Sequence, residues 1–350
     1  MRYRVEVWQT LAHGGYHGPI STLARMGLKI ASWPYGLGVL VRNTLFNHGW
    51  RKINRMSVPV VSVGNLALGG TGKTPCVEYI ARFYRDMGLQ VAIISRGYGS
   101  EVGRNDEALV LEENLPDVPH LQDPDRVAAA MRAVEELESE LLIVDDGFQH
   151  RRLYRDLDIV LIDAIRPPYR DALFPRGTLR ESARSLYRAD LVVLTRCDQV
   201  QSSDVDQLST WLKSYAPNTP LVITEHRAID LLGGTVPEPA ENLRGVEVAA
   251  FCGIGNPAAF RKTVEQLGAK LMSFRSYPDH HLYTRDDVRE LAKWAAPLPL
   301  ITTQKDWVKL RVSELGGRQL RAVRIGLSVR EGHEKFDQLL RRIALVNKDQ

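Results

Sequence analysis

The part of the sequence best suited to chemistry is a glycine-rich turn that carries a lysine and a threonine. An apolar run at residues 58–63 leads into Gly69-Gly70-Thr71-Gly72-Lys73-Thr74-Pro75. Glycine lets the backbone approach a ligand closely, and the N–H groups of such a loop bind anions together with the N-terminus of the next helix. Lys73 would reach the β- and γ-phosphates of a nucleotide, and the Thr74 hydroxyl would bind Mg²⁺. We therefore predict that these seven residues bind nucleotide phosphates.

This loop departs from the strict phosphate-binding pattern at one position. The pattern has glycine six residues before the lysine, where this chain has Ala67. The alternative interpretation is a glycine-rich turn between a strand and a helix, without a ligand. A complete Gly-Gly-Thr-Gly-Lys-Thr directly after an apolar strand favours phosphate binding.

An acidic pair, Asp145-Asp146, ends a second apolar run at residues 141–144. In nucleotide-binding proteins a buried strand of this kind delivers a carboxylate to Mg²⁺. Aspartate is also common in turns and helix caps. Because a phosphate loop lies upstream, we interpret Asp145 and Asp146, together with Thr74, as the metal ligands.

Two further clusters are ambiguous on the residues alone. Asp106-Glu107 could orient and deprotonate an acceptor hydroxyl, although solvated acids in a loop explain the pair equally simply. His280-His281 could tune such a base, but loop histidines are more often structural. No third ligand at metal spacing accompanies them, so we predict no zinc site.

Four arginines in a proline-containing stretch could bind phosphate through paired hydrogen bonds. They are Arg166, Arg170, Arg176 and Arg180. Ordinary surface charge explains the same spacing. The Thr-Arg-Cys-Asp run at residues 195–198 is only a partial match to a guanine-reading motif, because arginine replaces its lysine, so we do not predict GTP specificity.

Composition limits the classes of protein that this chain can belong to. The 350 residues suggest two domains, and 44% hydrophobic with 25% charged residues is ordinary for a globular chain. A net charge of only +4 argues against a nucleic-acid partner. Three widely separated cysteines form no disulfide framework. Nothing in the sequence implies an obligate protein partner.

The N-terminal residues are basic and apolar. Between Glu6 and Glu78 there is no acidic residue, and residues 19–50 are rich in aliphatic and aromatic side chains. The longest uncharged run, Ile30–Val41, is interrupted by Pro34 and Gly36 and is too short to span a bilayer. It is also a poor signal peptide. The residues leave open a helix on an anionic membrane surface or an amphipathic helix packed on the core.

Apolar strands alternate with helices through the rest of the chain. This pattern predicts an α/β fold with a parallel sheet of the phosphate-loop NTPase type, preceded by the N-terminal segment and followed by a second, smaller α/β domain. We expect the divisions 1–55, 56–225 and 226–350, since the chain becomes polar and rich in Gly and Pro after residue 226. The last helix, near residues 334–346, could pack on either domain.

Several motifs in this order resemble the tetraacyldisaccharide 4′-kinase family, which acts in lipid A biosynthesis. Besides the phosphate loop, they are Ser-Arg-Gly-Tyr-Gly at 95–99, Asp-Glu at 106–107, Asp-Asp-Gly-Phe-Gln-His at 145–150, Phe-Pro-Arg-Gly-Thr-Leu-Arg-Glu at 174–181, Phe-Cys-Gly-Ile-Gly-Asn-Pro at 251–257, Pro-Asp-His-His at 278–281 and Thr-Thr-Gln-Lys-Asp at 302–306. The resemblance extends to about Lys309. Arg176 and Gln304 depart from the residues usual in the family.

The resemblance implies an ATP- and Mg²⁺-dependent kinase that phosphorylates the 4′-hydroxyl of an acylated glucosamine disaccharide 1-phosphate at the cytosolic face of the bacterial inner membrane. It favours the membrane role for the N-terminal helix. It implies Asp106 as the catalytic acid–base residue, His280 as its partner and Lys73 as a further catalytic residue. Candidate substrate contacts are Arg96, Glu107, Gln149, Arg176 and Arg180. The alternatives are a switch or metallochaperone NTPase that acts on a protein, or a ligase that activates a carboxylate.

Overall fold

The computed structural model describes residues 8, 11, 15, 18–97 and 106–346. Most of the first 17 residues of the expected N-terminal segment lie outside this part of the chain. So do Tyr98 and Gly99 of the Ser-Arg-Gly-Tyr-Gly motif.

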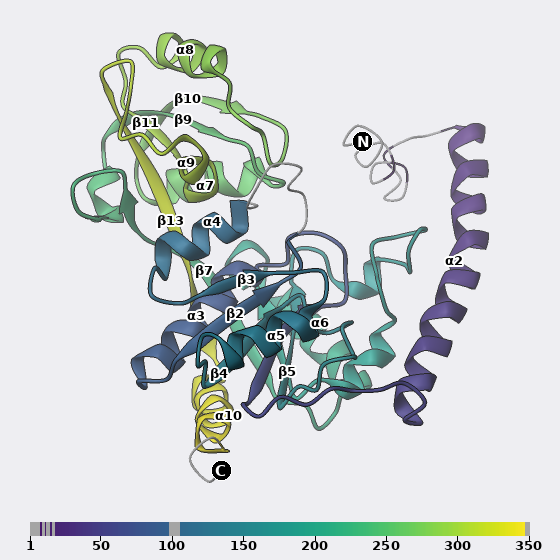
Figure 1. The fold of residues 1–350 in the computed structure, drawn as a ribbon. Coiled ribbons are helices and arrows are strands. Elements are labelled where there is room, and N and C mark those ends of the chain that lie inside the picture. Colours follow the sequence, from purple (N-terminus) through teal and green to yellow (C-terminus); the bar gives the residue numbers. More distant parts are fainter. Residues whose placement is uncertain (1–7, 9–10, 12–14, 16–17, 98–105, 347–350) are drawn as a thin grey trace.

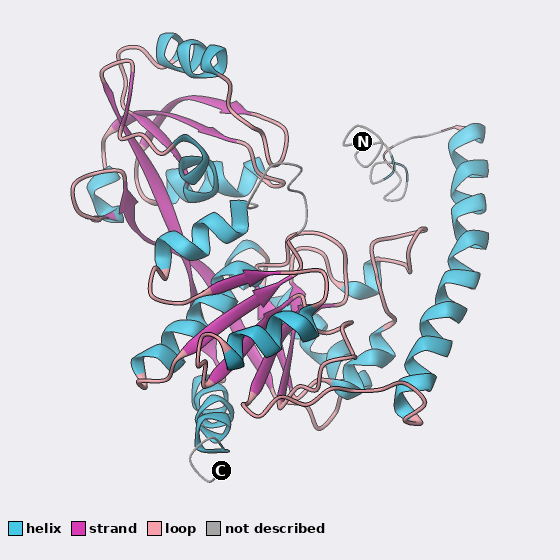
Figure 2. Cartoon of the chain, in the orientation of Figure 1, coloured by secondary structure: helices cyan, strands magenta, loops and turns pink. Residues whose placement is uncertain are grey.

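One continuous sheet runs through the molecule and forms two lobes (Figures 1 and 2). The strands of the first lobe, in their order across the sheet, are β3 (His120–Gln122), β2 (Val91–Ser95), β4 (Leu141–Asp145), β1 (Val60–Asn65), β5 (Leu157–Asp163), β6 (Leu191–Thr195) and β7 (Leu221–Leu232). The second lobe continues with β13 (Arg318–Glu331), β11 (Leu300–Thr303), β9 (Glu247–Cys252) and β10 (Lys270–Ser276). The short strands β8 (Glu238–Pro239) and β12 (Glu314–Leu315) pair with β7 and β13.

Neighbouring strands along this sheet are parallel except at the junction of the lobes, where β7 and β13 are antiparallel. The expected division at residue 226 falls inside β7, whose residues 223–232 pair with β13. The two lobes therefore share a hydrogen-bonded strand pair, and the division into residues 56–225 and 226–350 remains a prediction.

Helices cover both faces of the first lobe, as the continuous apolar strands require. They are α3 (Lys73–Asp86), α4 (Asp106–Asn114), α5 (Arg126–Glu135) and α6 (Ser202–Tyr215). Successive residues of β1 point to opposite faces: Val61 joins the core with α3, whereas Val60 joins the core with α5. The second lobe carries α7 (Pro257–Gln266), α8 (Arg285–Trp294) and α9 (Gln304–Leu310).

The last helix, α10 (His333–Val346), packs on the first lobe, which settles the choice left open by the sequence. Phe336 and Leu340 are fully buried in the same core as α3. The Tyr84 hydroxyl donates to the Leu340 carbonyl at 3.1 Å, and the Tyr79 ring stacks on Phe336. The chain thus leaves the first lobe after β7 and returns to it through β13 and α10.

The long helix α2 (Pro19–Asn47) lies along one side of the first lobe (Figure 1). Pro34 and Gly36 interrupt the apolar run but not the helix, which continues through both residues. A proline inside a helix removes one backbone hydrogen bond, and the remaining turns of this 29-residue helix maintain its course. In the described part of the chain, no helix has the length and apolar character needed to cross a membrane.

Candidate active site

The glycine-rich loop connects β1 to the first turn of α3, the geometry of a phosphate-binding loop. Gly72 precedes the helix with a φ of 82°, and a Cβ at this position would lie 2.8 Å from Nε2 of His226. Only glycine satisfies both conditions. Lys73 and Thr74, which follow Gly72 directly, belong to the first turn of the helix itself.

Side chains from neighbouring strands hold this loop in place. Asn65 Nδ2 donates to Thr71 Oγ1 at 2.8 Å, and Thr195 Oγ1 donates to the Thr71 carbonyl at 2.8 Å. Arg196 donates to the Gly70 carbonyl at 2.8 Å and pairs with Asp163 at 2.7 Å. These contacts orient the loop without using its remaining N–H groups, so they leave an anion site at the end of α3.

The structure also explains the departure at Ala67. This residue forms an isolated antiparallel bridge with Leu179, and the Leu68 N–H donates to the Thr178 carbonyl at 2.8 Å. An extended, paired backbone needs no glycine. The loop thus begins as an added strand against residues 178–179 and becomes glycine-dependent only at Gly69, with a φ of 107°.

The acidic pair lies beside Lys73, as expected. Lys73 Nζ is 3.6 Å from Oδ1 of Asp146, whose two oxygens also accept from Arg180 Nη1 at 2.8 and 2.7 Å. Asp145 lies at the end of β4, and its Oδ1 is buried with no hydrogen-bond partner. Burial raises the pKa of Asp145 to about 7, although Lys73 opposes this shift. An additional cation would favour the ionised form of this carboxyl group.

The two ambiguous clusters meet across the lobes. Nδ1 of His280 lies 2.7 Å from Oδ2 and 2.9 Å from Oδ1 of Asp106, although 174 residues separate them in the sequence. Asp106 is buried at the first turn of α4, and His280 follows β10 with a φ of 57°. Burial would raise the pKa of Asp106, but the hydrogen bond from His280 and the charge of Lys305 lower it to about 2. Asp106 is therefore ionised at neutral pH.

The next acid along α4 is also paired across the lobes. Lys305 Nζ lies 3.0 Å from Glu107 Oε1, and this charge is the main reason that the pKa of Glu107 is lowered. His281, in contrast, contacts Asp287 of α8 at 3.1 Å and does not join Asp106. Of the two histidines, only His280 reaches the first lobe through the contacts described.

The remaining candidate residues occupy different places. Gln149 donates to the Asn65 carbonyl at 2.8 Å and accepts from Arg180 at 3.2 Å, so both lie at the phosphate loop. Arg96 is exposed at the end of β2. Arg176 instead borders a cavity of about 590 Å³ beside α2, together with Lys29 and Trp33.

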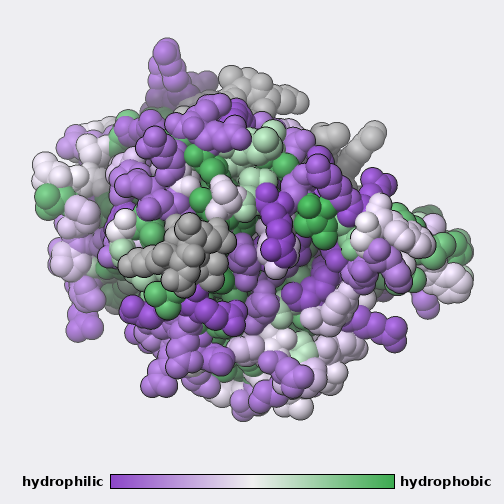
Figure 3. All heavy atoms as spheres, turned by 60° about the horizontal axis from the view of Figure 1, so that its bottom comes forward, coloured by the Kyte–Doolittle hydropathy of each residue, from purple (hydrophilic) through white to green (hydrophobic). Residues whose placement is uncertain are grey.

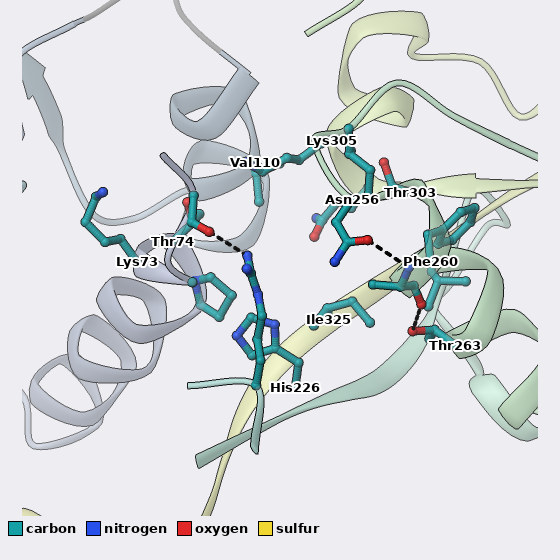
Figure 4. Close-up of a pocket in the computed structure, with 18 of the residues that line it drawn as sticks. Lys73, Thr74, Val110, His226, Asn256, Phe260, Thr263, Thr303, Lys305 and Ile325 are labelled. Atoms are coloured by element: carbon teal, nitrogen blue, oxygen red, sulfur yellow. Dashed lines mark hydrogen bonds between the residues drawn. The ribbon is translucent and has the colours of Figure 1, made fainter. Parts of the chain in front are cut away.

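A second cavity, of about 230 Å³, lies between the phosphate loop and the second lobe (Figure 4). Its wall includes Lys73, His226, Asn256, Phe260 and Ile325. His226 was missed by the sequence analysis, because a histidine within a strand carries no signal of a pocket. Burial, followed by the charge of Arg196, lowers its pKa to about 3, so this imidazole is neutral.

We expect the Asp106–His280 contact to stabilise the fold over a defined pH range. The hydrogen bond that His280 donates to Asp106 raises the pKa of His280 above 6.5. The contribution of His280 is therefore complete below pH 6.5 and is lost as pH rises through the raised value. Because the pKa of Asp106 is lowered, its contribution to stability is complete above pH 3.8 and is lost as pH falls through about 2.

Urea unfolding of the wild type and of His280→Gln at a series of pH values would measure this contribution. The difference in free energy of unfolding should be largest between 3.8 and 6.5, the ordinary pKa values of the two groups. We expect it to be about 1 kcal/mol or less, since His280 is half exposed. A difference that increases at alkaline pH would contradict the assignment.

The phosphate loop at the carboxyl edge of a parallel sheet, next to a pair of aspartates at a strand end, places the chain among the phosphate-loop nucleotide enzymes. A family model described as Tetraacyldisaccharide-1-P 4′-kinase matches residues 24–344, and the chain belongs to this family. It is 36% identical over 349 residues to the tetraacyldisaccharide 4′-kinase of Anaeromyxobacter dehalogenans (strain 2CP-C), covering 92% of each chain. It is 37% identical over 320 residues to that of Syntrophus aciditrophicus (strain SB), covering 82% of this chain and 84% of the relative.

A solved structure gives the same result. LpxK from Aquifex aeolicus in complex with ATP matches with a TM-score of 0.75 and 32% identity, over 91% of this chain and 99% of that one. The chain is therefore an ATP-dependent kinase that phosphorylates a tetraacyldisaccharide at the 4′ position in lipid A biosynthesis. This finding confirms the kinase prediction and removes the need for the switch and ligase alternatives.

Proposed function

We propose that ATP binds between the lobes and that Asp106 activates the acceptor hydroxyl. The observation that carries this proposal is the 2.7 Å contact between Asp106 and His280, which joins an ionised carboxylate of the first lobe to the second lobe. Glu107, the neighbour of Asp106, shares a cavity wall with Lys73. An acceptor held at Asp106 would therefore approach the phosphate group held by the loop.

The residues from Gly69 to Pro75 would bind the triphosphate, and the 230 Å³ cavity would receive the nucleoside. Lys73 would neutralise charge on the β- and γ-phosphates. Asp106 would orient the 4′-hydroxyl and accept its proton, while His280 keeps the carboxylate in position. Positioning and neutralisation of charge supply most of the rate enhancement in phosphoryl transfer.

The residues present fit a Mg²⁺ ion. Asp145 has a buried oxygen without a partner, and Asp146 and the Thr74 hydroxyl supply further oxygen ligands of the kind Mg²⁺ prefers. Among the described residues, no group of three or more His, Cys, Asp and Glu side chains is arranged to hold a metal by itself. This arrangement suits Mg²⁺, which usually keeps several waters and binds substrate phosphates. When bound, Mg²⁺ would neutralise charge on the transferred phosphate.

Asp145→Asn tests this assignment. We expect the Mg²⁺ concentration for half-maximal phosphate transfer to rise at least about 10- to 100-fold, the usual cost of losing even a residue that supports a metal ligand. Transfer from γ-labelled ATP to the acylated disaccharide in detergent, measured by chromatography across a Mg²⁺ titration, gives this value. Asp117→Asn removes a carboxylate that is 55% exposed and serves as the control. An unchanged Mg²⁺ requirement in Asp145→Asn would show that this carboxylate is not a ligand.

The substrate contacts are also part of the proposal. Glu107, Gln149 and Arg180 lie around the phosphate site, where they could meet the sugar. Arg176 borders the cavity beside Trp33 of α2, a position that suits the 1-phosphate of an acylated sugar. Arg96 is an exposed candidate at the end of β2.

Helix α2 would place the enzyme on the cytosolic face of the inner membrane, with no obligate protein partner. Its apolar side chains recur every three or four residues on an exposed face: Leu23, Met26, Ile30, Trp33, Leu37 and Leu40 are 57–74% exposed. Figure 3 shows hydrophobic residues at the right-hand edge of the molecule, the side on which α2 lies in Figure 1. Arg25 and Lys29 lie on the same helix, and the combination suits an anionic lipid surface.

The double variant Ile30→Glu/Leu37→Glu should bind vesicles containing phosphatidylglycerol at least about tenfold more weakly than the wild type, since two apolar side chains can no longer enter the lipid. Co-sedimentation with the vesicles measures this affinity. Met272→Glu changes an exposed apolar residue of β10, 58% exposed, and should bind like the wild type. Equal binding by all three proteins would argue against a lipid-facing α2.

A further inference from the structure

A buried carboxylate joins α2 to the first lobe. The side chain of Glu181 has no exposed surface, and it accepts hydrogen bonds from both sides. From α2, Arg42 Nη2 lies at 2.7 Å and Asn43 Nδ2 at 2.9 Å. From the core, Ser185 Oγ lies at 2.7 Å and two nitrogens of Arg188 lie at 3.0 Å. Removing one partner from a buried charge is strongly destabilising, so the shared carboxylate holds the helix against the core.

The residue before Glu181 belongs to the phosphate site. The Arg180 side chain donates to both oxygens of Asp146, at 2.8 and 2.7 Å, and Asp146 lies 3.6 Å from Lys73 Nζ. The Arg180 carbonyl accepts from the Tyr35 hydroxyl of α2 at 3.1 Å. The dipeptide Arg180-Glu181 therefore contacts both sites. Helix α2 binds the Arg180 carbonyl and the Glu181 side chain, and the Arg180 side chain binds Asp146 in the phosphate site.

A second connection leads to the same place. Arg151, five residues after Asp146, donates to the Asn43 carbonyl at 3.0 Å and to Asn47 Oδ1 at 2.8 Å, both in α2. The Arg188 guanidinium lies 4.4 Å from the centre of the Phe148 ring, which joins the segment of Glu181 to that of Asp146. The two attachments of α2, at Glu181 and at Arg151, thus both lie in segments that lead to Asp146, the carboxylate beside Lys73.

We propose that Glu181 is a positioning residue that couples the lipid-facing helix to the phosphate site. Binding of α2 to an anionic lipid surface would fix the position of the Arg180–Glu181 backbone. The Arg180 side chain would then fix the position of the Asp146 carboxylate. This inference rests on the proposed membrane role of α2. Coupling of two sites is reciprocal. If lipid bound at α2 changes the affinity for nucleotide, the nucleotide must change the affinity of α2 for lipid by the same factor.

The test measures vesicle affinity with and without nucleotide. Full-length protein is titrated with phosphatidylglycerol-containing vesicles, either alone or with saturating β,γ-methylene ATP and Mg²⁺. We expect the wild type to bind the vesicles about fivefold more tightly with the nucleotide, the lower end of typical coupling between sites. Arg42→Met should bind vesicles like the nucleotide-free wild type and gain little from the nucleotide. Arg42 is 39% exposed, so this variant should fold, and thermal unfolding verifies that it does.

Two further variants separate coupling from simple attachment. Arg42→Lys keeps a cation at Glu181 and should restore most of the nucleotide effect. Arg132→Met removes an arginine of α5 that pairs with Asp123 at 2.7 Å, outside the contacts between α2 and Glu181, and should respond like the wild type. A wild type that binds vesicles and phosphorylates its substrate, yet shows no nucleotide effect, would overturn this inference alone. A full nucleotide effect in Arg42→Met would also overturn it, whereas a wild type that does not bind vesicles would overturn the membrane role as well.

Discussion

Asp106→Asn is expected to lower the rate of phosphate transfer to the acylated disaccharide by about 10²- to 10⁴-fold, the usual contribution of a general base. The reason is the ionised state of this carboxylate. Burial alone would make Asp106 a weaker acid, but the hydrogen bond from His280 and the charge of Lys305 keep its pKa near 2. An amide of nearly the same shape cannot accept the proton of the acceptor hydroxyl.

The affinity for ATP separates this role from a structural one. Asp106 is not part of the phosphate loop, so Asp106→Asn should bind ATP within about threefold of the wild type, by titration calorimetry, if it contributes mainly to the chemical step. Asp123→Asn changes a partly exposed carboxylate that pairs with Arg132, and this variant should keep full activity. His280→Ala should lower the rate as well, and the double variant should be little slower than Asp106→Asn, because the two residues act as a unit. Near-normal turnover in Asp106→Asn would refute the assignment.

Lys73→Met should abolish measurable phosphate transfer, a loss of at least about 10²- to 10³-fold, because it removes the cation that we propose neutralises charge on the β- and γ-phosphates. The loss has a second physical cause. Lys73 is the main group that opposes the burial-driven rise in the pKa of Asp145, which already lies at about 7. Without this lysine, Asp145 should be protonated more completely at neutral pH, which would weaken its proposed role as a metal ligand.

Single-turnover transfer from γ-labelled ATP would measure this effect. Lys262→Met changes an exposed lysine of α7 and should leave the rate unchanged. Because the missing charge cannot be supplied by more nucleotide, raising ATP to saturation should not restore the rate of Lys73→Met. Recovery of the wild-type rate at high ATP would mean that Lys73 contributes to binding alone.

Local sequence patterns predicted the phosphate loop because its chemistry lies within seven consecutive residues. The loop needs a glycine at position 72, where φ is positive, a lysine and a threonine directly after it, and an apolar strand before it. All three features are visible in neighbouring residues of the sequence. The α/β alternation was equally accessible, because hydrophobic periodicity is local. Asp145 and Asp146 could be placed next to Lys73 because parallel strands end at the same edge of a sheet.

The sequence alone therefore determined the α/β class, the phosphate loop and the strand-end carboxylates, since each depends on interactions within a few residues or on a general rule of parallel sheets. The family resemblance implied His280 as the partner of Asp106, and the tertiary structure supplied the contact between them. Only the tertiary structure returned α10 to the first lobe and buried Glu181 between α2 and the core. These contacts join segments 138 or more residues apart. Residue types and spacing do not encode such distances, because the path of the chain through β7 and β13 decides which segments meet.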